Sequence, residues 1–162
     1  MKTIYLIRHA KSSWDEHTIE DHERPLNERG RQDAEKMAEY LKDQGIRPDF
    51  ALCSTAKRTK ETFSYFTRCF DSLPLHLTKK LYLASVSALE EEIHAIQNEY
   101  SHVLLFGHNN GVSELVSIIL EKNVDLPTCS FTQIEFPVND WKEADLKNAG
   151  IIAAISPKEL PE

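Results

Sequence analysis

The sequence predicts an α/β fold: a three-layer α/β/α sandwich around a mostly parallel central sheet with an antiparallel edge. Short apolar runs typical of buried strands alternate with segments whose apolar residues recur at helical spacing. The last two apolar runs have no amphipathic segment between them, so we expect those two strands to be antiparallel to each other. With 162 residues, 41% of them apolar, the chain suits one domain over residues 1–162 with a sizeable core.

The chain is predicted to begin with a strand, a polar loop and a helix. The run Thr3–Ile7 is apolar and rich in β-formers, which is typical of a buried strand. The polar segment Lys11–Arg24 indicates a loop. Asn27 suits the N-cap of a helix that runs to about Gln44, and Gly45 is a suitable C-terminal stop.

Two further strands are predicted before residue 80. Phe50–Cys53 is the second apolar run, and Ser54 or Thr55 is expected to open a helix over roughly Lys57–Arg68. Leu75–Leu77 is a short candidate for the third strand.

The second half of the chain repeats this alternation. Ser87 and Glu90 have the spacing of a capping box, so we expect a helix to start there. Val103–Phe106 is strongly apolar and predicts a fourth, buried strand, after which apolar residues recur at helical spacing. The two late strands are Phe131–Phe136 and Gly150–Ile155, on either side of the polar connection Val138–Asn148.

The charge and hydropathy of the chain exclude several classes of protein. Acidic residues outnumber basic ones, 26 to 19, and the net charge is -7. An acidic chain without a basic stripe is a poor partner for nucleic acid or an anionic membrane, so we expect neither. No apolar run approaches the roughly 20 residues that span a bilayer, and no signal-peptide pattern is present, so the cytoplasm is the expected location.

The cysteines Cys53, Cys69 and Cys129 are odd in number, widely spaced and without a C-x-x-C pattern. This arrangement predicts neither a disulfide framework nor a zinc cluster. Cys53 lies in an apolar run, which favours a role in core packing.

One loop could suggest a metal site. His17 and His22 lie close in sequence to Asp15, Glu16 and Asp21. Their spacing matches no helical ligand motif, so we interpret the segment as a solvated polar loop. We therefore expect neither a metal nor a cofactor.

Basic and imidazole side chains follow three of the predicted parallel strands. Arg8 and His9 come directly after the first strand, Arg58 lies one turn into the helix after the second, and His108 follows the fourth. In open α/β sheets the ligand site lies outside the carboxyl ends of the strands, so we expect these side chains to converge. Guanidinium forks bind phosphoryl oxygens in pairs, and a neutral imidazole can attack phosphorus. The sequence therefore predicts a phosphoryl-transfer site.

Four sequence blocks resemble the histidine phosphatase superfamily, which has the phosphoglycerate-mutase-like fold. Arg8–Trp14 and Asp21–Gly30 are similar to its SixA-like branch of phosphohistidine phosphatases. Ser54–Thr62 contains the Ser-x-x-x-Arg-x-x-x-Thr block, and Gly107–Asn109 contains the Gly-His block. Arg-His alone is a weak motif, but the four blocks in this order are highly specific.

The resemblance implies a function and a set of site residues. His9 would be the nucleophile that carries a transient phosphoryl group, and Arg8, Arg58 and His108 would bind the phosphoryl oxygens and stabilise the transition state. The implied enzyme is a metal-independent phosphatase that needs no cofactor and releases inorganic phosphate. Its implied substrate is a phosphorylated protein carrying phosphohistidine.

The chain departs from the family pattern in two places. Ala10 replaces the glycine that commonly follows the nucleophile, as in the SixA-like branch. The region Leu81–Ser85, where larger members carry an acidic residue for the leaving group, has no carboxylate, and Glu90 is interpreted as a capping residue. Asp21 is the candidate acid, although an Asp in this loop is equally typical of a turn.

Other functions stay open at this point. The site could belong to a phosphomonoesterase acting on a small phosphorylated metabolite, or to a catalytically silent phospho-ligand-binding module. A phosphomutase of the same fold would need a dedicated acid and closing segments, which the sequence lacks. A nucleotide-binding Rossmann module would need a G-x-G-x-x-G motif after the first strand, where none is found.

Overall fold

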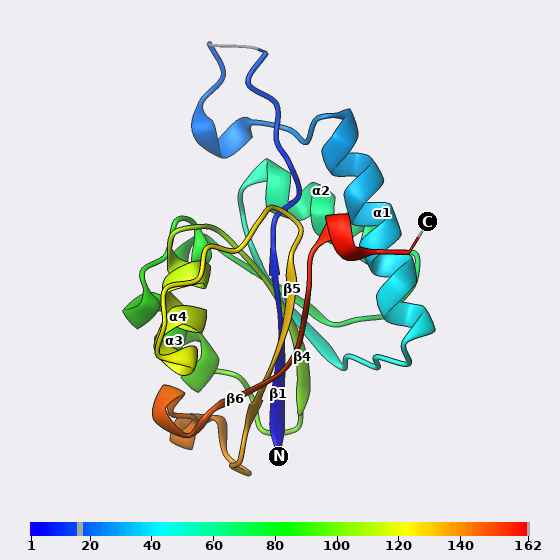
Figure 1. The fold of residues 1–162 in the computed structure, drawn as a ribbon. Coiled ribbons are helices and arrows are strands. Elements are labelled where there is room, and N and C mark those ends of the chain that lie inside the picture. Colours follow the sequence, from blue (N-terminus) through cyan, green and yellow to red (C-terminus); the bar gives the residue numbers. More distant parts are fainter. Residues whose placement is uncertain (16–17, 162) are drawn as a thin grey trace.

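The computed structural model describes residues 1–15 and 18–161. Over these residues, six strands form one mixed sheet in the order β3-β2-β4-β1-β5-β6. Figure 1 shows this sheet nearly edge-on, with β6 in front. The strands are β1 (Lys2–Arg8), β2 (Phe50–Ser54), β3 (Leu75–Thr78), β4 (His102–Gly107), β5 (Phe131–Phe136) and β6 (Gly150–Ile155).

The pairing of the strands confirms the predicted mixture of directions. β1 pairs in parallel with β4, β4 with β2, and β2 with β3. β5 runs antiparallel to β1, and β6 runs antiparallel to β5. The carboxyl ends of β1, β2, β3 and β4 therefore lie along the same edge of the sheet.

Helices cover both faces of the sheet, as predicted for a three-layer sandwich (Figure 1). α1 (Glu28–Asp43) and α2 (Lys57–Phe66) lie on one face, and α3 (Val86–His94) and α4 (Gly111–Leu120) lie on the other. Two apolar clusters fill the spaces between the layers. Strand β4 contributes to both clusters because successive side chains alternate: Leu104 and Phe106 face α1 and α2, whereas Leu105 faces α3 and α4.

The helix starts agree with the sequence at one position and differ at two. Asn27 caps α1 as predicted, accepting a hydrogen bond from the Gly30 amide at 2.8 Å. α2 has Ala56 as its N-cap and therefore no side-chain cap, and the Ser54 hydroxyl accepts from the Ala56 amide. The predicted capping box at Ser87 is wrong. The Ser85 hydroxyl caps α3, so this helix begins two residues earlier.

The predicted polar connection between β5 and β6 contains a buried aromatic residue. Trp141 is 0% exposed and belongs to the cluster beneath α3 and α4. Its indole N–H donates to the Tyr100 carbonyl at 2.7 Å. The prediction missed this contribution to the core because one tryptophan among charged residues gives no periodic signal.

Glycine at position 111 permits a close approach that shapes one side of the molecule. A Cβ atom there would lie 2.0 Å from the carbonyl oxygen of Ala84. Only glycine therefore allows the start of α4 to lie directly against the segment 81–85. This contact brings that segment to the turn that follows β4.

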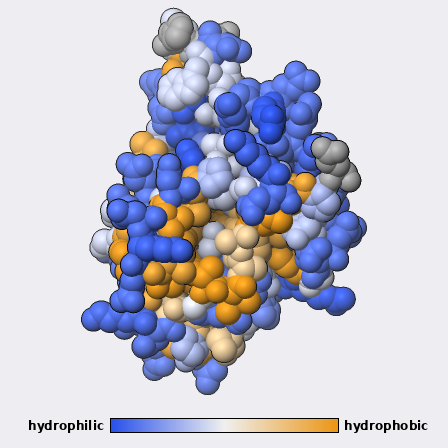
Figure 2. Space-filling model, viewed as in Figure 1, coloured by the Kyte–Doolittle hydropathy of each residue, from blue (hydrophilic) through white to orange (hydrophobic). Residues whose placement is uncertain are grey.

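The surface has two contrasting areas. Figure 2 shows an apolar patch over β6 and α4, whereas the end of the molecule beyond the carboxyl ends of β1 and β4 is mostly hydrophilic. On these two elements Ile118, Leu120 and Ile152 are 50%, 38% and 56% exposed. Among the described residues, no helix combines the length and apolar character that crossing a membrane requires.

Candidate active site

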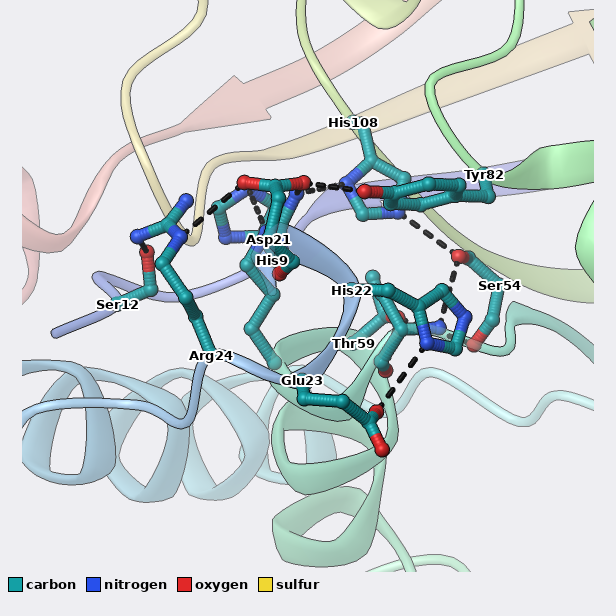
Figure 3. A network of polar contacts seen from close by, with 12 residues as sticks. His9, Ser12, Asp21, His22, Glu23, Arg24, Ser54, Thr59, Tyr82 and His108 are labelled. Atoms are coloured by element: carbon teal, nitrogen blue, oxygen red, sulfur yellow. Dashed lines mark hydrogen bonds and ion pairs between the residues drawn. The ribbon is translucent and has the colours of Figure 1, made fainter. Parts of the chain in front are cut away.

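Side chains from three chain segments meet at the carboxyl edge of the sheet. His9 follows β1, His108 follows β4, and Arg58 lies in the first turn of α2. Arg58 Nε lies 3.4 Å from His9 Nε2, and Arg58 Nη2 lies 3.4 Å from His108 Nδ1. All three side chains are buried, and the centroids of the two imidazole rings are 5.3 Å apart. Figure 3 shows His9 and His108 within the same polar network. The structure thus brings together groups that are far apart in the sequence.

Local hydrogen bonds orient the ring of His9. Its Nδ1 lies 2.7 Å from the Ala10 carbonyl oxygen, so Nδ1 carries the proton and donates it there. The Ala10 amide in turn donates to Thr62 Oγ1 at 3.0 Å, which fixes the backbone beside the ring. Nε2 is left unprotonated and faces the guanidinium group of Arg58.

Burial lowers the pKa of His9 to about 3, and the charges of Arg58 and Arg8 act in the same direction despite the opposing bond to Ala10. His9 is therefore neutral at pH 7. A neutral imidazole with an unprotonated Nε2 is the nucleophilic form of this side chain, and here the Nε2 lone pair accepts a long hydrogen bond from Arg58 Nε at 3.4 Å.

His108 has the same charge state but the opposite orientation. Its Nε2 donates to Ser54 Oγ at 2.8 Å, and its Nδ1 faces Arg58. Burial lowers the pKa of His108 to about 3, and the proximity of His9 and Arg58 adds to this effect. A bound phosphoryl dianion would place negative charge beside His108 and raise its pKa. Protonation of Nδ1 would then be favoured, and Nδ1 would become a hydrogen-bond donor.

Arg8 presents a donor that is not satisfied within the described residues. Its Nη1 donates to the Leu126 carbonyl at 2.7 Å, which anchors the guanidinium group. Its Nε is buried and has no partner in residues 1–15 and 18–161. An unsatisfied buried N–H is costly, and an oxygen atom of a bound anion would satisfy it.

These groups line a cleft of about 350 Å³. Arg8, His9, Arg58 and His108 line this cleft, and Lys11, Trp14 and Leu83 also contribute to it. Trp14 and Leu83 are 69% and 55% exposed, so they form an apolar rim around a cationic site. Such a site is suited to the charge of a phosphoryl group.

Asp21, the candidate acid, also lies at this cleft. It begins the short 3-10 helix Asp21–Glu23, and its carbonyl oxygen accepts from Arg58 Nη1 at 2.7 Å. Its carboxylate accepts from Arg58 Nη2 at 3.0 Å and from Arg24 Nε at 3.1 Å. Partial burial would raise its pKa, but hydrogen bonds from Tyr82 and Arg58 outweigh this and lower the pKa to about 2. Asp21 is therefore ionised in the unliganded protein.

Sequence reasoning missed two residues of this site, Tyr82 and Arg24. The Tyr82 hydroxyl donates to Asp21 Oδ2 (Figure 3). Arg24 binds Ser12 Oγ at 2.7 Å and stacks on Trp14, with its guanidinium carbon 3.5 Å from the ring centre. Tyr82 lies in the segment 81–85, where the resemblance to larger family members implies a carboxylate and not a phenol. Arg24 lies inside a recognised block but follows no strand.

Among the residues that the structure describes, no group of three or more His, Cys, Asp or Glu side chains is arranged to hold a metal ion. His22 instead bonds Thr55 Oγ1 at 2.8 Å and Glu23 at 3.2 Å. Glu16 and His17, considered above, lie outside the described residues.

The fold and the cationic cleft define the class of protein. Residues 4–102 match the histidine phosphatase superfamily, branch 1. The chain belongs to this superfamily and is a phosphatase with a SixA-like, phosphoglycerate-mutase-like fold.

Individual relatives agree with this assignment. An uncharacterized chloroplastic protein of Arabidopsis thaliana is 32% identical over 155 residues, which cover 88% of this chain and 70% of the relative. The structure of the proposed phosphohistidine phosphatase SixA of Agrobacterium tumefaciens has a TM-score of 0.84 and 26% identity, covering 96% and 98% of the two chains. A structure of the protein histidine phosphatase SixA with tungstate shares the fold, with a TM-score of 0.83, 23% identity and coverage of 98% and 99%.

Proposed function

We propose that this protein is a metal-independent phosphatase that transfers a phosphoryl group to His9 and then to water, with protein phosphohistidine as its substrate. The observation that carries the proposal is the environment of His9. A neutral Nε2 lies 3.4 Å from a buried guanidinium group, in a cleft that Arg8 and His108 also line. Phosphoryl transfer depends mainly on such positioning and charge neutralisation.

In the first step the lone pair of His9 Nε2 attacks phosphorus, and the bond from phosphorus to the substrate nitrogen breaks. The leaving imidazole takes the electron pair and acquires a proton from the surrounding water. Arg58 and the Nε donor of Arg8 bind the oxygens whose charge changes in the transition state. His108 donates from Nδ1 once the dianion has raised its pKa.

In the second step a water oxygen attacks the phosphorus of phospho-His9. The bond between phosphorus and Nε2 breaks, Nε2 regains its lone pair, and inorganic phosphate is released. The same cationic groups stabilise this transition state, because the phosphoryl oxygens remain in the same cleft.

The choice of substrate follows from the protonation of the leaving group. An alkoxide needs a strong proton donor, whereas an imidazole leaves readily near neutral pH. Asp21 has a pKa of about 2 in the unliganded protein, so it carries no proton at pH 7. It can act as an acid only after a bound phosphoryl group has displaced its carboxylate from Arg58. This supports a nitrogen-bound phosphoryl donor over an alkyl phosphate.

The net charge of the whole chain bears on the kind of partner. The chain is acidic, with a net charge of -7, which supports a phosphorylated protein rather than nucleic acid or a membrane as the partner. The cytoplasm is the proposed compartment.

A substrate panel tests the proposal. Turnover should fall in the order protein phosphohistidine, aryl phosphate, alkyl phosphate, and His9→Ala should lose essentially all of it. His76→Ala is the matched control, because His76 is exposed on β3 away from the cleft. Rapid turnover of alkyl phosphates together with slow turnover of phosphohistidine would contradict the substrate. Substantial activity of His9→Ala would contradict the mechanism.

A further inference from the structure

Tyr82 connects the segment 81–85 to the opposite side of the cleft. Its hydroxyl donates to Asp21 Oδ2, although the two residues are 61 positions apart in the sequence. Its ring meets the ring of His108 edge-on at 5.4 Å and the ring of His22 edge-on at 4.9 Å. The guanidinium carbon of Arg58 lies 5.9 Å from the ring centre. Tyr82 is therefore held in place independently of its bond to Asp21.

The charged and titratable groups around Asp21 come from several elements. Arg24 lies at the end of the same 3-10 helix, Arg58 comes from α2, and His108 follows β4. A phosphoryl group that binds Arg58 competes directly with the Asp21 carboxylate for Nη2. Tyr82 is neutral and does not depend on that exchange, so its hydrogen bond can persist when the ion pair with Arg58 is lost.

We propose that Tyr82 is a positioning residue that keeps the Asp21 carboxyl group at the edge of the cleft when substrate displaces it from Arg58, and thereby sets the pH at which Asp21 exchanges a proton. This inference rests on the proposed function. It also gives the segment 81–85, which has no carboxylate, a part in the reaction.

In the proposed reaction Asp21 exchanges protons, and Tyr82 itself undergoes no chemical change. In the first step Asp21, which becomes protonated once a bound phosphoryl group has displaced it from Arg58, gives its proton to the leaving oxygen of a phosphate ester as the bond from phosphorus to that oxygen breaks. An imidazole leaving group instead takes its proton from water. In the second step the carboxylate takes a proton from the attacking water as the new bond from oxygen to phosphorus forms. The phenol keeps its own proton throughout, because burial and the neighbouring carboxylate raise the pKa of Tyr82. Its donated hydrogen bond favours the ionised form of Asp21.

Tyr82→Phe tests this role, because phenylalanine keeps the ring contacts and removes only the hydroxyl. With an aryl phosphate as substrate, kcat is expected to fall about tenfold, as for loss of a hydrogen bond to a charged group. KM and inhibition by inorganic phosphate should change less than twofold. The acid limb of the pH profile should move to higher pH, because Asp21 loses a donor that favours its ionised form. Tyr65→Phe, on α2 away from the cleft, is the matched control.

A double-mutant cycle shows whether Tyr82 acts through Asp21. Tyr82→Phe should have no further effect on kcat when Asp21→Asn is already present. Replacing Tyr82 with 3-fluorotyrosine, a more acidic phenol of nearly the same size, should move the acid limb to lower pH. Losses that multiply in the double variant, or an acid limb that stays in place in both substitutions at position 82, would overturn the proposal.

The fate of the phosphoryl label separates this inference from the proposed function. Phosphate on His9 in both wild type and Tyr82→Phe, combined with multiplying losses, would refute only the role of Tyr82. Absence of phosphate from His9 in both proteins would refute the phosphatase mechanism on which that role depends.

Discussion

The two sides of the cleft are built in different ways. On one side, His9 and His108 directly follow parallel strands, and Arg58 lies at the start of the helix after a third. All three are almost fully buried. On the other side, Asp21 and Tyr82 belong to connecting segments, and the Asp21 side chain is 42% exposed. The sheet fixes the first side, whereas hydrogen bonds between loops fix the second.

This difference indicates that the two sides of the cleft have different functions. Groups that touch the phosphoryl oxygens must be placed precisely relative to one another, and strand ends provide that precision. Groups that exchange protons with the leaving group or water can come from segments that adjust when substrate binds. We therefore expect substitutions on the strand side to remove activity, and substitutions on the loop side to change its dependence on pH and leaving group.

The largest effect is expected when an arginine on the strand side of the cleft is replaced, compared with an arginine on the loop side. Arg58→Ala removes a donor that contacts both histidines and should lower kcat/KM about 100- to 1,000-fold, as for loss of an oxyanion donor. Arg24→Ala removes one donor to the Asp21 carboxylate, which keeps Arg58 and Tyr82 as partners, and should lower kcat/KM only about tenfold. Steady-state kinetics with one aryl phosphate measures both. Similar losses in the two variants would remove the distinction between the sides.

The sequence predicted the side of the cleft that strand ends form, but not the contact between loops on the other side. The alternation of apolar runs and helical periodicity predicted the layers and strand directions, and strand ends predicted the grouping of Arg8, His9, Arg58 and His108. Tyr82 could not be predicted, because its contact with Asp21 joins two loops and has no periodic signal. It depends on the close packing of Ala84 against glycine at the start of α4.

The close packing of Ala84 against Gly111 should contribute to the stability of the folded protein. Gly111→Ala places a methyl group against the Ala84 carbonyl and should lower the free energy of unfolding by about 1–3 kcal/mol, the usual cost of overpacking. Gly150→Ala is the control, because a Cβ atom there meets nothing within 4 Å. Urea denaturation compares the two. Equal stability of both variants would show that the segment 81–85 is not held by this contact.

A smaller and more selective effect is expected at Asp21. Asp21→Asn should slow hydrolysis of an alkyl phosphate about 100-fold, within the range for loss of a general acid. Phosphohistidine, whose leaving group needs less assistance, should be slowed much less. Initial rates on the two substrates at pH 7 give the ratio. Equal losses on both would show that Asp21 does not supply the leaving-group proton.

The smallest expected effect is on how the free energy of unfolding depends on pH, to which His9 and His108 both contribute. The folded protein holds the pKa of His9 and His108 at about 3, whereas an unfolded histidine titrates near about 6.5. As pH falls below about 6.5, the unfolded chain gains protons that the folded protein does not, so the free energy of unfolding decreases. His108→Gln should make this decrease shallower in urea denaturation at pH 7.5 and pH 5.5. An unchanged decrease would contradict the neutral state of His108.

In the proposed mechanism His9, placed by the end of β1, carries the phosphoryl group. Rapid acid-free quenching of the protein with ³²P-labelled phosphohistidine substrate, followed by mapping of the label, tests it most directly. We predict a burst of label on His9 Nε2 that decays as inorganic phosphate appears, and no such burst in His9→Ala. Release of phosphate without label on the protein, or label on another residue of the wild type, would contradict the account.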